Sequence, residues 1–214
     1  MMVTLKLATS LDGRIATASG ESRWITGAAA REQVHRLRAM HAGVLVGVDT
    51  VIADDPELTV RLAGYVGFQP VRVVLDSRQR IPLDCKLVTT ARDRRTIVFS
   101  TQASNKRLTD AGIDVVTVRD DDGRVDPKAA LEALEAMTHF PAIMIEGGGQ
   151  VAASFLGRGL VDFVEWFRAP IVLGDEGRPA VGGFVLKELA SAPRFRRVSV
   201  EPLGDDLWER YVRA

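Results

Sequence analysis

The chain has little of what would place it outside the cytoplasm or in a membrane. Among its 214 residues it has one cysteine, Cys85, which cannot form an intrachain disulfide. The start Met1–Lys6 lacks the basic stretch and apolar core of a secretory signal. No apolar run approaches the roughly 18 to 20 residues of a membrane span. We therefore expect a cytoplasmic protein that has no membrane partner.

An excess of charge of one sign is also absent. The chain has 28 Lys and Arg residues and 28 Asp and Glu residues, so its formal net charge is zero. A surface without a basic excess gives no reason to expect a nucleic-acid partner. Local positive groups must therefore hold any anionic ligand.

Metal-ligand patterns are missing as well. The histidines His35, His41 and His139 have no metal-binding spacing with carboxylates or with Cys85. We therefore expect no metal ion. We interpret Cys85 as a small, partly buried apolar residue.

Short β-branched runs that alternate with helical patterns are what the sequence does contain. The runs that predict buried strands are Val3–Thr9, Val44–Val48, Val71–Leu75, Thr96–Phe99, Val115–Val118 and Ala142–Ile145. Helices are predicted over Ala28–Met40, from Asp126-Pro127-Lys128 onward, and over Val151–Leu156. This alternation predicts an α/β fold with a mostly parallel, twisted central sheet and helices on both faces.

The C-terminal part has a different pattern. Three strands are predicted at Val161–Phe167, Arg197–Glu201 and Leu207–Val212, and they are joined by long Gly- and Pro-rich stretches. We expect them to form an antiparallel ribbon on the parallel sheet. No linker is long or polar enough to divide the chain, so residues 1–214 are predicted to form a single domain. The run Asp120–Gly123 is interpreted as a solvated turn.

A glycine-rich turn follows the last predicted strand of the sheet. The segment Met144–Gln150 reads Met-Ile-Glu-Gly-Gly-Gly-Gln, and a helical pattern begins directly after it. Glycines allow a ligand to approach the backbone, and the N–H groups of a helix start favour phosphate. The alternative is a tight turn that needs glycine for its geometry alone, and this segment by itself does not decide between them.

Four further motifs precede this turn in a fixed order. They are Val3–Ala16, which contains Ser10-Leu11-Asp12-Gly13; Gly20–Gly27; Val46–Arg61, which contains Asp54-Asp55-Pro56-Glu57-Leu58-Thr59-Val60-Arg61; and Val73–Ser77. From Met2 to about Pro202 the chain resembles the pyrimidine reductases of the riboflavin pathway. That family has a dihydrofolate-reductase-like fold, and in bacteria it usually forms the C-terminal half of a bifunctional deaminase-reductase. This chain starts at the first reductase strand, so we expect no deaminase domain.

The resemblance implies an activity and an assembly. The family uses NADPH to reduce the ribosylamino group of 5-amino-6-(5-phosphoribosylamino)uracil, or of its undeaminated diaminopyrimidine analogue, to the ribitylamino product. The relatives form homodimers. In this chain the alternating run Val161–Phe167 offers a face that two copies could share. We expect the same small phosphorylated pyrimidine substrate and a homodimer.

Substrate contacts carry over from the family to Ser22, Arg38, Leu58, Arg61 and Glu146. Arginine suits a phosphate because its planar fork donates two hydrogen bonds. Taken alone, Arg38 reads as a solvated helix charge beside Arg36, and Arg61 as a surface charge after a turn. Of the two, Arg61 is the firmer match because the Asp-Asp-Pro-x-Leu-Thr-x-Arg run is intact.

Cofactor contacts carry over in the same way. They fall on Ala8, Trp24, Thr50, Asp54, Ser77, Gly148, Gly149, Gln150, Val151, Ala152, Ala153 and Ser154. If their segment is helical, Thr50 and Asp54 lie one turn apart and face the same way, although helix capping is an alternative role for them. Trp24 packs beside the nicotinamide or pyrimidine in this reading, whereas a core position is the alternative. Ser77 is placed to meet the adenosine 2′-phosphate.

Two residues are candidates for catalysis. Glu146 matches the substrate-contacting acid of the family, and Lys6 lies on the first strand, where relatives place a lysine. Either could move the proton during opening of the aminal to the reducible imine, because burial shifts the pKa of such groups toward neutrality. The nearby Asp12 is interpreted as a turn former in Asp-Gly.

Two other functions remain as alternatives. The fold could reduce dihydrofolate or another small imine or carbonyl with NADPH. Against this, a folate has no phosphate for Arg38 and Arg61 to bind. A nucleotide-binding module without catalysis is the second alternative, and the presence of Lys6 and Glu146 argues against it.

Overall fold

The structure is a computed structural model that describes residues 1–214. Their contacts group them into two compact units. The first consists of Met1 and Leu37–Met144, and the second of Met2–Arg36 and Ile145–Ala214. The first unit is thus almost entirely an insertion in the sequence of the second. The single reductase domain expected from the sequence stays a prediction.

Parallel strands form the first unit. They are β3 (Gly43–Gly47), β4 (Val71–Leu75), β5 (Thr96–Ser100) and β6 (Asp114–Thr117), and each pairs in parallel with the next. In the strand order β9 (Ala142–Ile145) lies on the other side of β3. All residues of β3, β5 and β9 are buried, as expected for strands covered on both faces. The predicted strands of this region are confirmed.

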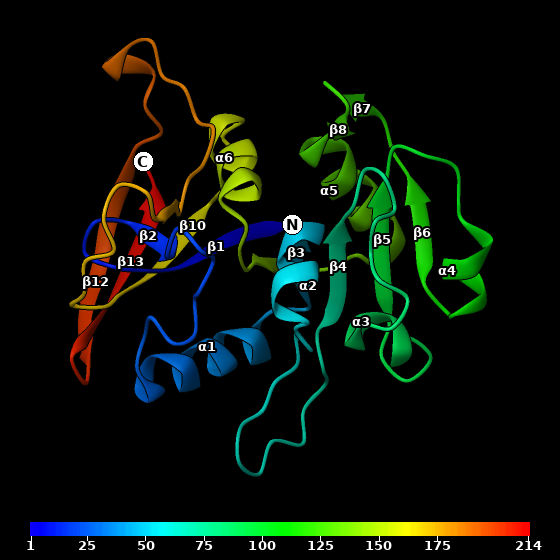
Figure 1. Cartoon of the computed structure of the whole chain (residues 1–214), viewed down its shortest axis with the longest axis horizontal. Helices are drawn as coiled ribbons and strands as arrows, with labels where there is room; N and C mark the ends of the chain where they lie inside the picture. Colours follow the sequence, from blue (N-terminus) through cyan, green and yellow to red (C-terminus); the bar gives the residue numbers. More distant parts are fainter. The chain divides into compact units, whose positions relative to one another are not determined.

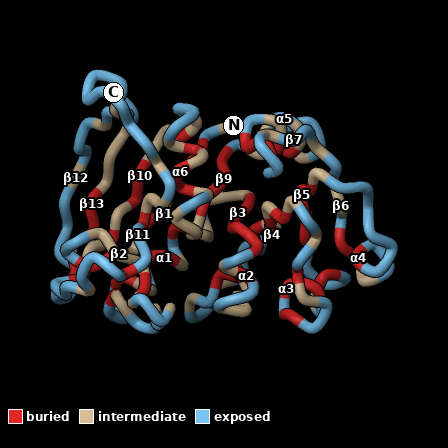
Figure 2. The backbone as a smooth tube through the Cα atoms, turned by 45° about the horizontal axis from the view of Figure 1, so that its top comes forward, coloured by how far each residue is buried: buried red, intermediate tan, exposed pale blue.

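Helices cover this sheet. They are α2 (Val48–Asp54), α3 (Lys86–Thr89), α4 (Lys106–Asp110) and α5 (Pro127–Thr138). Figures 1 and 2 show α5 on one side of the strands and α2 and α3 on the other. The Asp126 side chain caps α5 by accepting from the Lys128 N–H at 2.9 Å, as predicted. The strand predicted to reach Val48 ends at Gly47, because α2 begins at once.

The turn expected in the acidic run is the tip of a small hairpin. Strands β7 (Asp120–Asp121) and β8 (Arg124–Val125) pair antiparallel. Between them Asp122 and Gly123 both have positive φ, 53° and 75°. The predicted turn is confirmed, and it joins two short strands.

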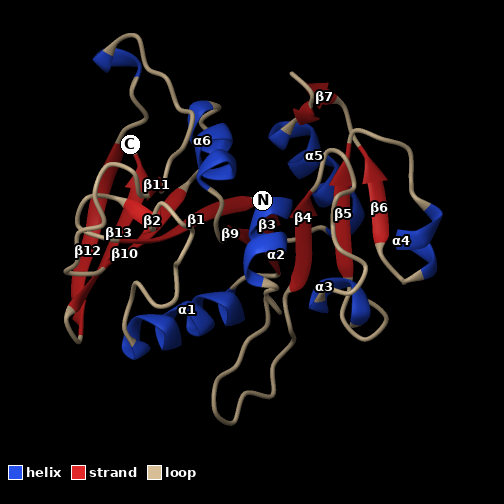
Figure 3. Ribbon diagram, in the orientation of Figure 1, coloured by secondary structure: helices blue, strands red, loops and turns tan.

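The second unit mixes parallel and antiparallel pairing (Figure 3). Strand β1 (Met2–Thr9) runs parallel to β10 (Phe163–Arg168), which pairs antiparallel with β13 (Asp206–Arg213), and β13 pairs antiparallel with β12 (Phe195–Leu203). The predicted C-terminal ribbon is therefore confirmed. The core of the second unit contains the fully buried side chains Leu5, Phe155 and Phe167.

The remaining elements of the second unit are short. A separate small sheet pairs β2 (Arg14–Ala16) with β11 (Arg178–Pro179), and η1 spans Leu189–Ser191. Helix α6 (Gly149–Gly157) follows the glycine turn, and α1 (Ala28–Met40) begins in this unit and ends in the first. None of the helices has both the length and the apolar character that crossing a membrane requires.

Candidate active site

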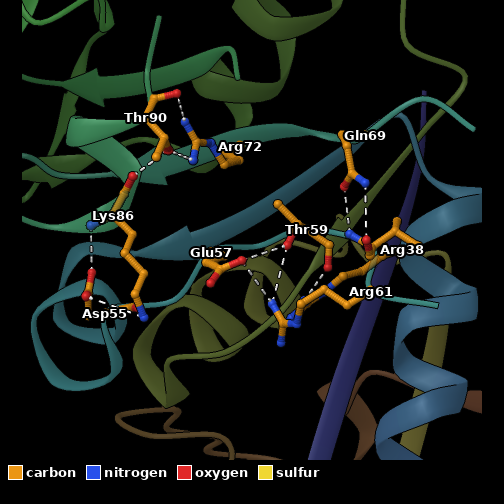
Figure 4. A network of polar contacts seen from close by, with 10 residues as sticks. Arg38, Asp55, Glu57, Thr59, Arg61, Gln69, Arg72, Lys86 and Thr90 are labelled. Atoms are coloured by element: carbon orange, nitrogen blue, oxygen red, sulfur yellow. Dashed lines mark hydrogen bonds and ion pairs between the residues drawn. The ribbon is translucent and has the colours of Figure 1, made fainter. Parts of the chain in front are cut away.

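Two of the predicted substrate residues meet in the first unit. Arg38, in the last turn of α1, donates from Nη1 to the Thr59 carbonyl oxygen at 2.8 Å. Arg61 donates from Nη1 to the Thr59 hydroxyl at 3.3 Å. Figure 4 shows both guanidinium groups converging on this threonine. The structure thus brings together two positive charges that the sequence separates.

The backbone between α2 and Arg61 makes this convergence. Helix α2 ends at Asp55 in the left-handed conformation, with φ 41°. Leu58 is also left-handed, with φ 54°, and its side chain is buried. The Val60 N–H donates to Gln69 Oε1 at 2.7 Å, and Gln69 Nε2 returns a bond to the Val60 oxygen at 3.1 Å. These two bonds fix the chain at Val60, directly after Thr59.

A carboxylate also lies at this site. Glu57 Oε2 is 3.6 Å from Arg61 Nη1 and accepts from the Thr59 hydroxyl at 3.3 Å. The Arg61 side chain is 53% exposed and that of Glu57 is 40% exposed. Exposed ion pairs of this kind contribute about 0 to 1 kcal/mol. Glu57 can therefore hold the guanidinium in place and still yield to a phosphate, which can accept two parallel hydrogen bonds from arginine.

The two arginines of α1 differ in their surroundings. Arg36 forms an exposed pair with Glu32 at 2.7 Å within the helix. Arg38 is half-buried and contacts the backbone of Thr59, in another segment. The interpretation as a solvated helix charge therefore fits Arg36 but not Arg38.

One arginine of Figure 4 is fully committed to structure. Arg72, the second residue of β4, is 1% exposed and donates to the Thr90 hydroxyl at 2.7 Å and to the Leu87 carbonyl at 3.2 Å. Burial lowers the pKa of its guanidinium to about 10. Arg72 ties β4 to the segment that contains α3 and has no free face for a ligand.

The predicted cofactor residues of this unit follow the carboxyl ends of its strands, where parallel sheets bind ligands. Thr50 and Asp54 lie one turn apart on α2, which confirms that their segment is helical. Ser77 follows β4, and its hydroxyl accepts from the Val125 N–H at 2.9 Å. Its carbonyl accepts from the Thr101 hydroxyl at 2.9 Å. Ser77 therefore has a structural role whether or not it meets a cofactor.

In the glycine turn of the second unit, two glycines are required by the backbone conformation and the third by packing. Gly147 and Gly148 have φ of 109° and 86°, a region that side chains disfavour. At Gly149 the reason is packing, because an added Cβ would lie 2.5 Å from the Pro179 carbonyl oxygen. The Gly182 N–H also donates to the Gly149 oxygen at 3.0 Å. The first two glycines thus meet the geometric requirement of a tight turn, and the protein's own backbone approaches the third.

The residues of helix α6 predicted to contact the cofactor differ in how far they are exposed. Gly148 caps the helix without a side chain, and the N–H groups of the first turn have no acceptor within the helix. Gln150 is exposed, and Val151 and Ser154 are half-buried. Ala152 and Ala153 are 1% and 8% exposed, so their side chains belong to the core. They could contact a cofactor only through the backbone.

The predicted catalytic residues both belong to the second unit. Lys6 and Ala8 alternate with buried neighbours on β1, so they share one face of the strand and are half-buried. Glu146 follows β9 directly and is also half-buried. A lysine and a glutamate in such positions can hold or move a proton.

Trp24 is not a core residue. Its side chain is 68% exposed, and the guanidinium carbon of Arg31 lies 4.5 Å from the centroid of the ring. It lines an open hollow of about 560 Å³ whose walls also include the start of α1 and the turn at Leu203–Asp206. Ser22 is half-buried, and its carbonyl accepts from the Ile25 N–H at 3.1 Å. An exposed aromatic surface fits a ligand-binding role better than a core role.

Asp12 does more than form a turn. It accepts from the Ser10 hydroxyl at 2.6 Å, and its other bonds come from the backbone N–H groups of Leu173, at 3.1 Å, and Gly174, at 2.8 Å. The Ser10 bond is the main reason why the pKa of Asp12 is lowered to about 2. The sequence interpretation therefore missed the anchoring of a distant loop.

Cys85 is 6% exposed, and burial raises the pKa of its thiol, which agrees with the predicted packing role. No group of three or more His, Cys, Asp or Glu side chains is placed to hold a metal ion.

Comparison with known proteins identifies the family. Residues 1–208 match the model of the RibD C-terminal domain. This chain belongs to the RibD C-terminal domain family. It is 37% identical over 214 residues to the riboflavin biosynthesis protein RibD of Actinobacillus pleuropneumoniae, covering 98% of this chain and 56% of that protein.

Two further relatives are an archaeal reductase of similar length and a bacterial RibD protein of known structure. The 2,5-diamino-6-ribosylamino-4(3H)-pyrimidinone 5′-phosphate reductase of Methanothermobacter thermautotrophicus is 37% identical over 98% of this chain and 97% of its own length. The solved structure of Acinetobacter baumannii RibD has a TM-score of 0.87 at 33% identity, covering 100% of this chain and 58% of that one. The chain thus spans about half the length of the bacterial RibD proteins. The predicted dihydrofolate-reductase-like α/β fold is confirmed.

Proposed function

We propose that this chain is an NADPH-dependent pyrimidine reductase of riboflavin biosynthesis. Its substrate is 5-amino-6-(5-phosphoribosylamino)uracil or the undeaminated diaminopyrimidine analogue, and its product carries the ribitylamino group. The archaeal relative, named as a reductase of the diaminopyrimidine 5′-phosphate and matched over 97% of its length, supports this proposal. As part of it, residues 1–214 act as a single reductase domain.

The convergence of Arg38 and Arg61 on Thr59 is the observation that carries the proposal. Two guanidinium groups at one residue, beside the positive-φ backbone of Leu58, form a local positive site in a chain of zero net charge. Such a site suits a sugar phosphate, because charge-assisted bonds from arginine are strong and geometrically specific. Ser22 and Glu146 are the remaining proposed substrate contacts. Dihydrofolate would leave these two charges without a phosphate partner.

The residues present fit a nicotinamide cofactor. Gly147 and Gly148 keep the start of α6 clear of side chains, which leaves room for a phosphate at its N–H groups. Further proposed contacts are Ala8, Trp24, Thr50, Asp54, Ser77 and the run Gly148–Ser154. When bound, NADPH supplies the hydride that reduces C1′ of the sugar. We place Ser77 near the 2′-phosphate on the adenosine ribose of NADPH.

Lys6 and Glu146 handle the proton in this proposal. Opening of the ribosylamine ring to an imine requires a proton at the ring oxygen and loss of one from the exocyclic nitrogen. Both side chains are half-buried, and they can deliver and accept these protons. Addition of the hydride to C1′ and return of a proton to the exocyclic nitrogen then leave the open ribitylamino chain.

An assay of NADPH oxidation tests the proposal. The purified chain is given the deaminated pyrimidine phosphate, the undeaminated analogue and dihydrofolate in parallel, with NADPH or NADH. We expect oxidation of NADPH with one or both pyrimidine phosphates and little with dihydrofolate. Activity with dihydrofolate alone would reject the proposed substrate, and equal rates with NADH would reject the cofactor preference.

We also propose a cytoplasmic homodimer. The face predicted on Val161–Phe167 is mostly covered, because β10 lies between β1 and β13 and Val161, Val164 and Phe167 are buried, so we place the shared face on the edge strand β12. This strand is exposed along most of its length, and its Val198 and Val200 are 55% and 43% exposed. Exposed apolar side chains on an edge strand favour pairing with another chain. Sedimentation at micromolar concentration should give the mass of two chains, and the mass of one chain would contradict the proposal.

A further inference from the structure

The exposed indole of Trp24 is held by an arginine. A tryptophan that is 68% exposed has little packing to fix its orientation. The Arg31 guanidinium carbon lies 4.5 Å from the ring centroid, inside the roughly 6 Å range of cation–π attraction. Arg23 lies at 6.0 Å, the outer limit of that range. Arg31 therefore covers one face of the ring and is its main partner.

Arg31 is itself fixed at the start of α1. Its Nη1 donates to the Thr26 carbonyl oxygen at 2.7 Å, and Thr26 is buried. The guanidinium is thus hydrogen-bonded to the backbone and also lies over the indole ring. A side chain bound at both places loses little freedom when a ligand reaches the other face of the ring.

The C-terminal hairpin fixes the start of the same helix. Asp206, the first residue of β13, accepts from the Gly27 N–H through Oδ2 at 2.6 Å. It is only 4% exposed, and a carboxylate at a helix N-terminus is favoured by the helix dipole. Trp24, Arg31 and Asp206 all line the hollow of about 560 Å³. The contacts thus run from the hairpin through α1 to the indole.

We propose that Arg31 and Asp206 are positioning residues for Trp24. Asp206 fixes the start of α1, Arg31 then orients the indole, and the exposed part of the ring is presented to the nicotinamide cofactor. This inference rests on the proposed function, in which Trp24 is a cofactor contact. It gives Arg31 and Asp206 no chemical step.

Arg31→Met tests the role of the guanidinium, because methionine keeps an unbranched apolar side chain. Calorimetric titration should show that the Kd of NADPH rises about three- to tenfold. The KM of NADPH should rise in parallel, while kcat and the KM of the pyrimidine stay within about twofold. Arg31→Lys, which keeps a cation, should restore part of the affinity. Arg36→Met on the exposed face of α1 is the matched control and should bind NADPH like the parent.

A double-mutant cycle tests whether Arg31 acts through the indole. In a Trp24→Ala background, Arg31→Met should cause no further loss of NADPH affinity. The same loss in both backgrounds would overturn the inference, as would an unchanged Kd in folded Arg31→Met. If circular dichroism shows that Arg31→Met does not fold, Arg31→Lys and Asp206→Asn replace it. Each should raise the NADPH Kd by about twofold or more only when Trp24 is present, and an unchanged Kd would overturn the inference.

Measurements of NADPH binding and oxidation by the parent protein distinguish failure of this inference from failure of the proposed function. A parent that binds and oxidises NADPH, with an Arg31→Met variant that does so equally well, overturns only the positioning role. A parent that binds no nicotinamide cofactor removes the proposed function and the inference with it.

Discussion

The two units offer positive groups to an anion in different ways. In the first, side chains supply the charge, since Arg38 of α1 and Arg61 of the loop between α2 and β4 meet at Thr59. In the second, the backbone does so, since Gly147 and Gly148 open the start of α6. A site of the first kind fails when a charge is lost. A site of the second kind fails when a side chain is added.

Loss of a charge should have the largest effect. If Arg61 binds the ribosyl phosphate, Arg61→Ala leaves that dianion without a charge-assisted partner, which typically costs about 2 to 5 kcal/mol. At roughly 1.4 kcal/mol per tenfold, kcat/KM for the phosphorylated pyrimidine should fall by about thirty-fold or more. Steady-state kinetics measure this, and NADPH affinity should barely change.

A control variant and a control substrate accompany the Arg61→Ala experiment. Arg36→Ala removes an exposed charge from α1 and should leave kcat/KM unchanged. A dephosphorylated substrate should react poorly with the parent and be insensitive to Arg61→Ala. Equal losses on both substrates would assign Arg61 to the fold or the cofactor.

An added side chain in the glycine turn should come next. Gly148→Val places a branched side chain at φ 86°, which costs about 1 to 3 kcal/mol of folding free energy. It also fills the space that a phosphate needs, so NADPH affinity should fall by about tenfold or more. Fluorescence titration measures the affinity. Gly148→Ala separates strain from bulk, and an unchanged affinity in folded Gly148→Val would remove the site.

The neighbouring glycine should respond in stability more than in binding. The Cβ of Gly149→Ala would lie 2.5 Å from the Pro179 oxygen, so the segment that contains Pro179 must shift. Overpacking of this kind typically costs about 1 to 3 kcal/mol. Thermal unfolding should show a lower Tm, with a smaller loss of NADPH affinity than for Gly148→Val. A Tm equal to that of the parent would mean that the two backbones do not touch in solution.

The smallest effect concerns pH. Bonds from Ser10, Leu173 and Gly174 favour the charged form of Asp12, so its pKa falls from 3.8 to about 2 on folding. A group with a lowered pKa stabilises the fold above its unfolded pKa, and this contribution is lost as the pH falls through the folded value. The Tm advantage of the parent over Asp12→Asn should therefore shrink between about pH 5 and pH 2. A constant difference would show that the carboxylate charge is not involved.

Local patterns were sufficient to predict most of the fold. The β-branched runs at Val71–Leu75 and Thr96–Phe99 became β4 and β5, and Asp126-Pro127 marks the start of α5. The helices α3 and α4 were not predicted, because four or five residues are too few to show a periodicity. The sheet of β2 and β11 was missed because its strands exist only through their pairing with each other.

The site was predictable residue by residue but not in its contacts. The Asp-Asp-Pro-x-Leu-Thr-x-Arg run marked Arg61, yet the contact of Arg38 with Thr59 depends on the left-handed turn at Leu58. The anchoring of Leu173 by Asp12 and the packing of Pro179 on Gly149 join residues far apart in sequence. Such contacts leave no local periodicity, so only the folded chain reveals them.

The interrupted sequence of the second unit has a consequence for the order of folding. Strand β1 pairs with β10, and the Val3 N–H bonds to Asp162 across 159 residues. The first unit pairs strands that follow one another along the chain, so its loops close at a smaller entropic cost. During synthesis, β1 must stay unpaired with β10 until the rest of the first unit has left the ribosome. Pulse-labelled hydrogen exchange during refolding should therefore protect the amides of β4 before those of β1, and the reverse order would contradict this.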